Sequence, residues 1–171
     1  MAISAAAGGV AIRAGEGDPV PGLGMAHKVD GARLGGHLLV MEGVIPPGVL
    51  VHPHTHTRED ECSYIAEGEL VFLVGDEVVQ VSAGDMVPKP RGVMHAFWNA
   101  SERPARVIEM HAPATFDRYY DELGALVGQH PPGSDGFIAA FGELARRYGL
   151  ITHWDDMPNL VARFGLGQVR R

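Results

Sequence analysis

Short runs of alternating apolar and polar residues, separated by glycine and proline, fill the first two thirds of the chain. Side chains of a β-strand point alternately to its two faces, so this period of two indicates strands with one buried face. Gly75 and Asp76 form a two-residue turn signal between two such runs, which predicts a hairpin. The pattern predicts an all-β barrel or sandwich with strands at 37–45, 49–56, 62–66, 70–74, 77–81, 86–89, 94–99 and 105–111.

After residue 113 the apolar residues recur at helical spacing, which predicts a tail of amphipathic helices. We expect three helices, which begin at Thr115, at Ser134 or Asp135, and at Asp155 or Asp156. Each has an apolar face that must be covered. Two interpretations remain open. The helices pack outside the barrel or at a dimer interface, which we favour, or one of them closes the mouth of the barrel as a lid.

The beginning of the chain is rich in glycine and alanine, which predicts a loose arm with a short strand near residues 10–13. The expected fold class is therefore all-β with added helices, arranged in three parts. Residues 1–36 form an N-terminal arm, residues 37–112 form the barrel core, and residues 113–171 form a helical extension packed on the barrel.

Composition limits the partners and the compartment. With 14 basic against 21 acidic residues the net charge is −7, which argues against nucleic acid or an anionic membrane as the main partner. Cys62 is the only cysteine, so no intrachain disulfide can form and a reducing compartment is expected. No stretch is apolar for long enough to span a bilayer, and no positively charged start typical of a secretory signal is present. We expect a cytoplasmic protein.

Four residues have the spacing of metal ligands. His54 and His56 are two apart on a predicted strand, so their side chains lie on one face. Glu61 follows after a short polar turn and can return to the same place from the next strand. His95 must come from a distant strand, which only the fold can bring close. Three imidazoles and one carboxylate suit a divalent transition metal.

The segments around these residues each carry a longer motif. Together they resemble the paired motifs of the cupin superfamily, and the chain is similar to its small, single-domain, metal-binding, quercetinase-like members. The resemblance implies a double-stranded β-helix barrel, related to the jelly roll, with the metal inside and with His54, His56, Glu61 and His95 as its ligands. The fixed positions of the two motifs are Gly48, His54, His56, Glu61 and Gly68, and then Gly84, Pro90, Gly92, His95 and Asn99.

Strand alternation extends the site to a candidate substrate pocket. Ser63 and Ile65 share the face of Glu61, and Phe97 shares the face of His95. His52 shares the face of His54, and three roles remain open for it: support of a ligand, contact with substrate, or a solvated rim position, which we favour.

The final predicted barrel strand carries two alternating pairs of side chains. Glu109 and His111 lie on one face, and Ile108 and Met110 lie on the other. If the first pair faces inward, it adds an acid and a base to the cavity. Because an apolar core favours the second pair inside, we expect Glu109 and His111 in a solvated or interface position.

A metal with four protein ligands keeps one or two coordination positions open, which is typical of a catalytic site. By resemblance we expect a mononuclear dioxygenase that acts on a small organic substrate, aromatic or polyketide-like, with Glu61 able to leave the metal and act as a base. The alternatives are a redox-neutral cyclase, isomerase or lyase, and a non-catalytic binding or sensor protein. The ligand set accepts Fe, Mn, Ni, Co, Cu or Zn. Because an exposed sheet edge favours pairing, we also expect a homodimer.

Overall fold

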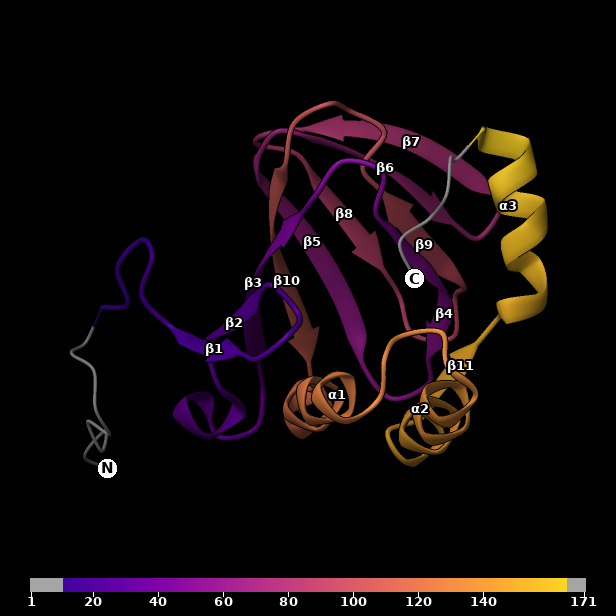
Figure 1. The fold of residues 1–171 in the computed structure, drawn as a ribbon. Coiled ribbons are helices and arrows are strands. Elements are labelled where there is room, and N and C mark those ends of the chain that lie inside the picture. Colours follow the sequence, from indigo (N-terminus) through magenta and orange to yellow (C-terminus); the bar gives the residue numbers. More distant parts are fainter. Residues whose placement is uncertain (1–10, 166–171) are drawn as a thin grey trace.

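Two antiparallel sheets face each other and enclose the interior of the barrel (Figure 1). The structure is a computed structural model, and it describes residues 11–165. The six-stranded sheet has the order β1-β2-β3-β10-β5-β8. Its strands are β1 (Asp18–Val20), β2 (Met25–Val29), β3 (Leu39–Ile45), β10 (Ala105–Ala112), β5 (Asp60–Glu67) and β8 (Met86–Lys89).

The second sheet has five strands in the order β11-β4-β9-β6-β7. Consecutive strands of the chain repeatedly pass from one sheet to the other, as in a double-stranded β-helix. β4 lies in this sheet and β5 in the other, so the loop between them crosses the barrel. The strands are β11 (Leu150–Thr152), β4 (Leu50–His56), β9 (His95–Trp98), β6 (Glu69–Val74) and β7 (Glu77–Ser82).

The interior of the barrel contains an apolar cluster with contributions from both sheets. Ile65 and Val107 come from the six-stranded sheet, and Phe72 and Phe97 come from the five-stranded sheet. The Phe72 and Phe97 rings stack with their centroids 4.9 Å apart. Every second side chain of these strands is buried in the interior, which explains why alternating apolar and polar residues in the sequence predict the strands.

The helices cover two different parts of the barrel. α1 (Asp117–Gln129) and α2 (Asp135–Arg147) lie at the end where β4 continues into β5 (Figure 1). Their apolar residues pack with Leu39 and Met41 of β3. After the short 3₁₀-helix η2 (Trp154–Asp156), α3 (Met157–Phe164) packs outside the five-stranded sheet, against Trp98. A second 3₁₀-helix, η1 (Gly31–Leu34), precedes β3. No helix of the described chain is long and apolar enough to cross a membrane.

The helix boundaries confirm two of the three predicted starts. The Ser134 hydroxyl accepts a hydrogen bond from the Phe137 N–H at the start of α2, and Asp156 is the N-cap position of α3. The prediction for Thr115 was wrong, because α1 begins at Asp117 with no side-chain cap. The Thr115 hydroxyl donates instead to Glu59, a fully buried carboxylate from another part of the chain. A tertiary hydrogen bond has replaced the local one.

The eight predicted strands correspond to β3 through β10, and the bounds of β8 are as predicted. The expected loose arm contains β1 and β2, which extend the six-stranded sheet beyond β3. Residues 11–13 form no strand, and residue 10 lies outside the described range. β11, which pairs with β4, was also not predicted, because three residues are too few to show a period. The division of the chain at residues 36 and 112 stays a prediction.

Candidate metal centre

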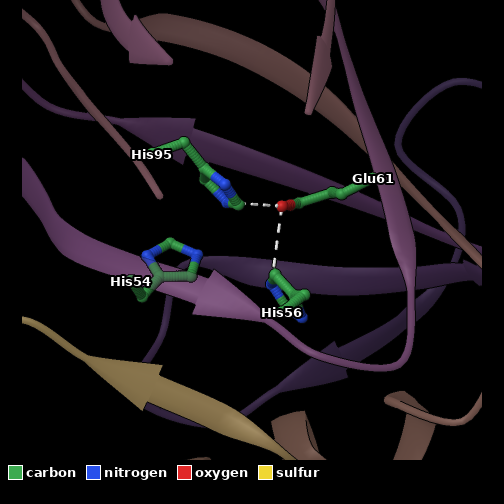
Figure 2. A group of neighbouring side chains, drawn as sticks. All are labelled: His54, His56, Glu61 and His95. Carbon is green, nitrogen blue, oxygen red and sulfur yellow. Dashed lines mark ion pairs between the residues drawn. The ribbon is translucent and has the colours of Figure 1, made fainter. Parts of the chain in front are cut away.

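The four predicted ligands meet inside the barrel. His54 and His56 come from β4, Glu61 from β5 and His95 from β9, and their side chains point toward one another (Figure 2). One ligand atom of each lies within 4.8 Å of the others. The Oε2 atom of Glu61 is 2.9 Å from Nε2 of His95 and 3.5 Å from Nε2 of His56. All four residues are at most 7% exposed.

Pairing of non-adjacent strands produces this convergence. His54 faces His95 directly in the register of β4 and β9. Glu61 belongs to the opposite sheet, so the short loop after His56 carries it to the other side of the same space. The sequence pattern explains the first pair of histidines, whereas the register of β9 supplies the third.

A β-bulge interrupts β4 beside His52. Val51 pairs with Phe97 and His54 pairs with His95, so two residues of β4 lie opposite one residue of β9. His52 nevertheless keeps its ring centroid 5.3 Å from that of His54, although the bulge interrupts strict alternation between them. Its ring stacks on Trp154, with centroids 4.6 Å apart, and burial lowers its pKa to about 4. His52 thus lies beside a predicted ligand, and the three roles considered for it stay predictions.

The three imidazoles are held so that one ring nitrogen remains free. Nδ1 of His54 is 2.7 Å, and Nδ1 of His95 is 3.1 Å, from the main-chain carbonyl oxygen two residues earlier. Nδ1 of His56 is 3.4 Å from Oε2 of Glu59. A neutral imidazole that donates from Nδ1 has its lone pair on Nε2, so the His54 and His95 rings present Nε2 as a metal ligand. Nδ1 of His56 has no hydrogen-bond partner in the described chain, and Nε2 of this ring faces Oε2 of Glu61.

Burial sets the charge states that metal binding requires. Burial lowers the pKa of His95, and it holds the pKa of His54 well below its usual value. Both rings are therefore neutral at neutral pH. Burial alone would raise the pKa of Glu61, but Lys89 and the neighbouring histidines together outweigh it, so the net pKa lies well below the usual value. Neutral imidazoles and an ionised carboxylate are the forms that bind metal.

The unsatisfied atoms of the cluster fit a cation. Within residues 11–165, Oε2 of Glu61 and Nε2 of His95 are buried and have no hydrogen-bond partner. Buried acceptors that face each other without a proton donor are costly, and a metal ion between them removes that cost. Their nitrogen and oxygen chemistry suits a divalent transition metal. The cluster could therefore hold one such ion.

The predicted orientation of the last barrel strand was wrong. Glu109 and His111 face the interior and are 2% and 0% exposed, whereas Ile108 and Met110 are half-buried on the outer face. The prediction assumed an apolar interior, but this part of the barrel is polar. Nε2 of His111 is 3.6 Å from Oε1 of Glu61, so His111 borders the predicted ligands.

Lys89, which the sequence analysis did not single out, forms a buried network with Glu109. Nζ of Lys89 is 2.9 Å from Oε1 of Glu61 and 2.8 Å from Oε2 of Glu109. The Ser63 hydroxyl donates to both oxygens of Glu109, at 3.0 and 2.8 Å. Ser63 is thus buried beside the site as predicted for a pocket residue, but Glu109 occupies the adjacent space. Strand alternation had placed Ser63 on the face of Glu61 and had left an inward position open for Glu109, but it gave no signal for Lys89.

The other predicted pocket residues lie deeper in the barrel. Ile65 and Phe97 belong to the apolar interior cluster, and both are at most 5% exposed. The Phe97 ring centroid is 5.3 Å from Nζ of Lys89, so this ring borders the charged network. The predicted contact of these residues with a substrate stays a prediction.

The start of α1 closes the site. The Phe116 ring lies 4.5 Å from the His56 ring, between centroids, and it stacks on His111 at 5.5 Å. The Tyr120 hydroxyl is 3.0 Å from Nε2 of His111. The two interpretations of the helical tail therefore apply to different helices: α1 covers the candidate centre, and α3 packs outside the barrel.

Comparisons with known proteins agree with this architecture. A family model described as a cupin domain matches residues 41–111. Germin-like protein subfamily 2 member 1 of Arabidopsis thaliana is 33% identical over 102 residues, which are 54% of this chain and 44% of that protein. Quercetin 2,3-dioxygenase of Bacillus subtilis is 22% identical over 115 residues, which are 66% of this chain and 34% of that protein. The chain thus spans less than half the length of these relatives.

A solved structure provides a further comparison. The crystal structure of a predicted oxalate decarboxylase from Thermotoga maritima aligns with a TM-score of 0.50 and 28% sequence identity. The alignment covers 52% of this chain and 78% of that one. The similarity therefore concerns about half of this chain.

Proposed function

Because residues 41–111 of this chain form a cupin domain, we propose that the cluster of His54, His56, Glu61 and His95 binds one divalent transition metal. We propose further that the protein is a metal-dependent dioxygenase that acts on a small organic substrate, aromatic or polyketide-like. The observation that carries the proposal is the complete, buried ligand set with its free Nε2 atoms. The similarity to a quercetin dioxygenase supports the choice of chemistry.

When bound, the metal would supply Lewis acidity and one or two open positions for a substrate with adjacent oxygens or for dioxygen. The chain itself supplies the surroundings. Phe116 and the apolar cluster exclude water from the site. Glu61 is the group we propose as the base, through Oε2, because Lys89 occupies its other oxygen. Loss of turnover in Glu61→Gln with the metal retained would support this role.

Elemental analysis of the purified protein, combined with oxygen uptake, tests the proposal. The wild type and the exposed-site control His37→Ala should carry about one metal ion per chain, and His54→Ala/His95→Ala should carry none. Iron, manganese, nickel or copper, together with oxygen uptake on chelating phenols or diketones, would support a dioxygenase. Absence of metal from the wild type after incubation with each ion would overturn the proposal.

A redox-neutral lyase, cyclase or isomerase is the second candidate. The similarity to a predicted oxalate decarboxylase favours it, because decarboxylation is a lyase reaction. The two candidates differ in their need for oxygen: turnover that continues without oxygen, and with zinc in the site, would favour the second. Stoichiometric metal without turnover of any substrate would instead favour a binding or sensor protein.

The outer face of the six-stranded sheet supports the proposed homodimer. Met86, Tyr64 and Ile108 lie side by side on adjacent strands of that face, and Met86 and Tyr64 are 56% and 38% exposed. A second copy of the chain would cover this row. We also propose a cytoplasmic location, because Cys62 is the only cysteine, and no nucleic-acid partner, because the net charge is −7.

A further inference from the structure

We propose that Lys89 is a positioning residue that makes Glu61 a one-oxygen metal ligand. The inference rests on the proposed metal site, and nothing in the cupin motifs includes Lys89. Its side chain is fully enclosed, and its ammonium group lies between the carboxylates of Glu61 and Glu109. Few lysines are buried in this way, because removing an ammonium group from water is costly unless it is paired.

The sheet register explains how Lys89 reaches Glu61. The two residues are direct partners on β8 and β5, with their side chains on the inner face. Glu109, on β10, is the direct partner of Ser63, two residues further along β5. The ammonium group also lies over the Phe72 and Phe97 rings, 5.7 and 5.3 Å from their centroids. These contacts leave Nζ little freedom to move.

The two oxygens of the Glu61 carboxylate therefore have different partners. Oε1 is 2.9 Å from Nζ of Lys89, whereas Oε2 is the oxygen near His95 and His56. A carboxylate with one oxygen in a charge-assisted hydrogen bond offers only the other to a metal. Glu61 would therefore hold a bound metal through Oε2 alone, and the position that a second carboxylate oxygen would take would be left to other ligands.

Glu109 holds Lys89 rather than the metal. It accepts from Lys89 and, through both oxygens, from the Ser63 hydroxyl. Without Glu109, the ammonium group would pair with Glu61 alone and would be free to turn away from it. Ser63, Glu109 and Lys89 therefore form a chain of contacts that ends on one oxygen of a ligand.

A thermal double-mutant cycle on the metal-free protein tests the contact itself. Lys89→Met should lower the Tm by about 10 °C, because it removes the one cation that lies between two buried carboxylates. In a Glu61→Gln background the same substitution should lower it by at most about half as much. Additive Tm changes would overturn the inference. This arm needs no metal, so it tests the contact between Lys89 and Glu61 separately from the proposed metal site.

Cobalt(II) titration tests the number of oxygens bound. The wild type should bind one Co²⁺ per chain, and Lys89→Met should show weaker visible absorption, because the freed Oε1 joins the metal and raises the coordination number. Lys28→Met is the matched control, since Lys28 also pairs with a glutamate, Glu42, at 2.9 Å, but outside the site. Its spectrum should equal that of the wild type.

The double variant Lys89→Met/Glu109→Gln removes one positive and one negative charge. It replaces Lys89→Met in the cobalt titration if the single variant does not fold. It should show the same weakened absorption. A spectrum unchanged from the wild type in both Lys89 variants would overturn the inference. Absence of Co²⁺ uptake by the wild type would instead overturn the proposed metal site.

Discussion

Glu59 connects the candidate metal centre to the helix that covers it. Its carboxylate faces Nδ1 of His56 and accepts from the Thr115 hydroxyl, and the residue is fully buried. A carboxylate behind a ligating histidine fixes the ring and raises its basicity. Glu59 is thus part of the site although it follows no motif position.

Glu59→Gln should weaken metal binding by about 10- to 100-fold. The neutral amide keeps the shape of the side chain but loses the charge that supports the His56 ring. Competition with a chromophoric chelator measures the affinity, and Glu77→Gln, an exposed glutamate on β7, is the control. Equal affinities in the two variants would show that Glu59 does not support His56.

His111 makes the stability of the metal-free protein depend on pH. Burial lowers its pKa to about 4, and the charge of His56 acts in the same direction, whereas Glu61 opposes the shift. A histidine in the unfolded chain takes up its proton near about pH 6.5, so acidification below that value favours the unfolded chain. Between about pH 7 and about pH 5, His111 alone should remove about 2 kcal/mol from the free energy of unfolding.

Denaturant titrations of chelator-treated protein at these two pH values measure this loss. His111→Gln should lose about 2 kcal/mol less than the wild type, and the exposed-site control His37→Gln should lose the same as the wild type. If His111→Gln and the wild type lost equal amounts, another group would be responsible.

At the scale of elements, α1 and α3 both stabilise the barrel but in different places. Phe116, directly before α1, contacts the ring of His56, one of the proposed ligands. Leu160 of α3 packs with Trp98 on the outer side of the five-stranded sheet. Only the first of these helices lies between the candidate centre and solvent.

Phe116→Ala and Leu160→Ala should each lower the free energy of unfolding by about 2–5 kcal/mol, because both side chains are buried. Only Phe116→Ala should also speed the removal of bound metal by a chelator, since it opens the covered end of the site. Stopped-flow mixing with the chelator measures the rate. Similar rates in the two variants would argue against a covering role for α1.

At the scale of the whole molecule, the polarity of the six-stranded sheet is partly inverted. Near the candidate centre its inner face carries Lys89 and Glu109, and its outer face carries Met86, Tyr64 and Ile108. An apolar outer face is costly in water unless another surface covers it. Because charged residues occupy inner positions of these strands, apolar residues lie on the outer face. The proposed second copy of the chain would cover that face.

Met86→Asp should shift the protein from dimer to monomer, because it places a charge in the centre of the proposed interface. Val79→Asp is the control, since Val79 is also exposed, at 43%, but belongs to β7 of the other sheet. Light scattering at several concentrations measures the mass. A wild type that is monomeric throughout would contradict the proposed dimer.

The amino-acid sequence by itself determined the features that depend on local direction and spacing. The period of two predicted β3 through β10, the helical period predicted the tail, and the motif spacing predicted His54, His56, Glu61 and His95 as one group. These predictions succeed because a strand or helix repeats its geometry over neighbouring residues, which the sequence displays directly.

Only the tertiary structure decided the position of His52, the inward direction of Glu109 and the pairing of Lys89 with Glu61. The bulge beside His52 depends on the register of two strands far apart in the sequence. Which face of β10 points inward depends on ion pairs between charged side chains inside the barrel. A prediction that places the more apolar face inward therefore selects the wrong face. Both arise from contacts between distant residues, and local periodicity carries no information about those contacts.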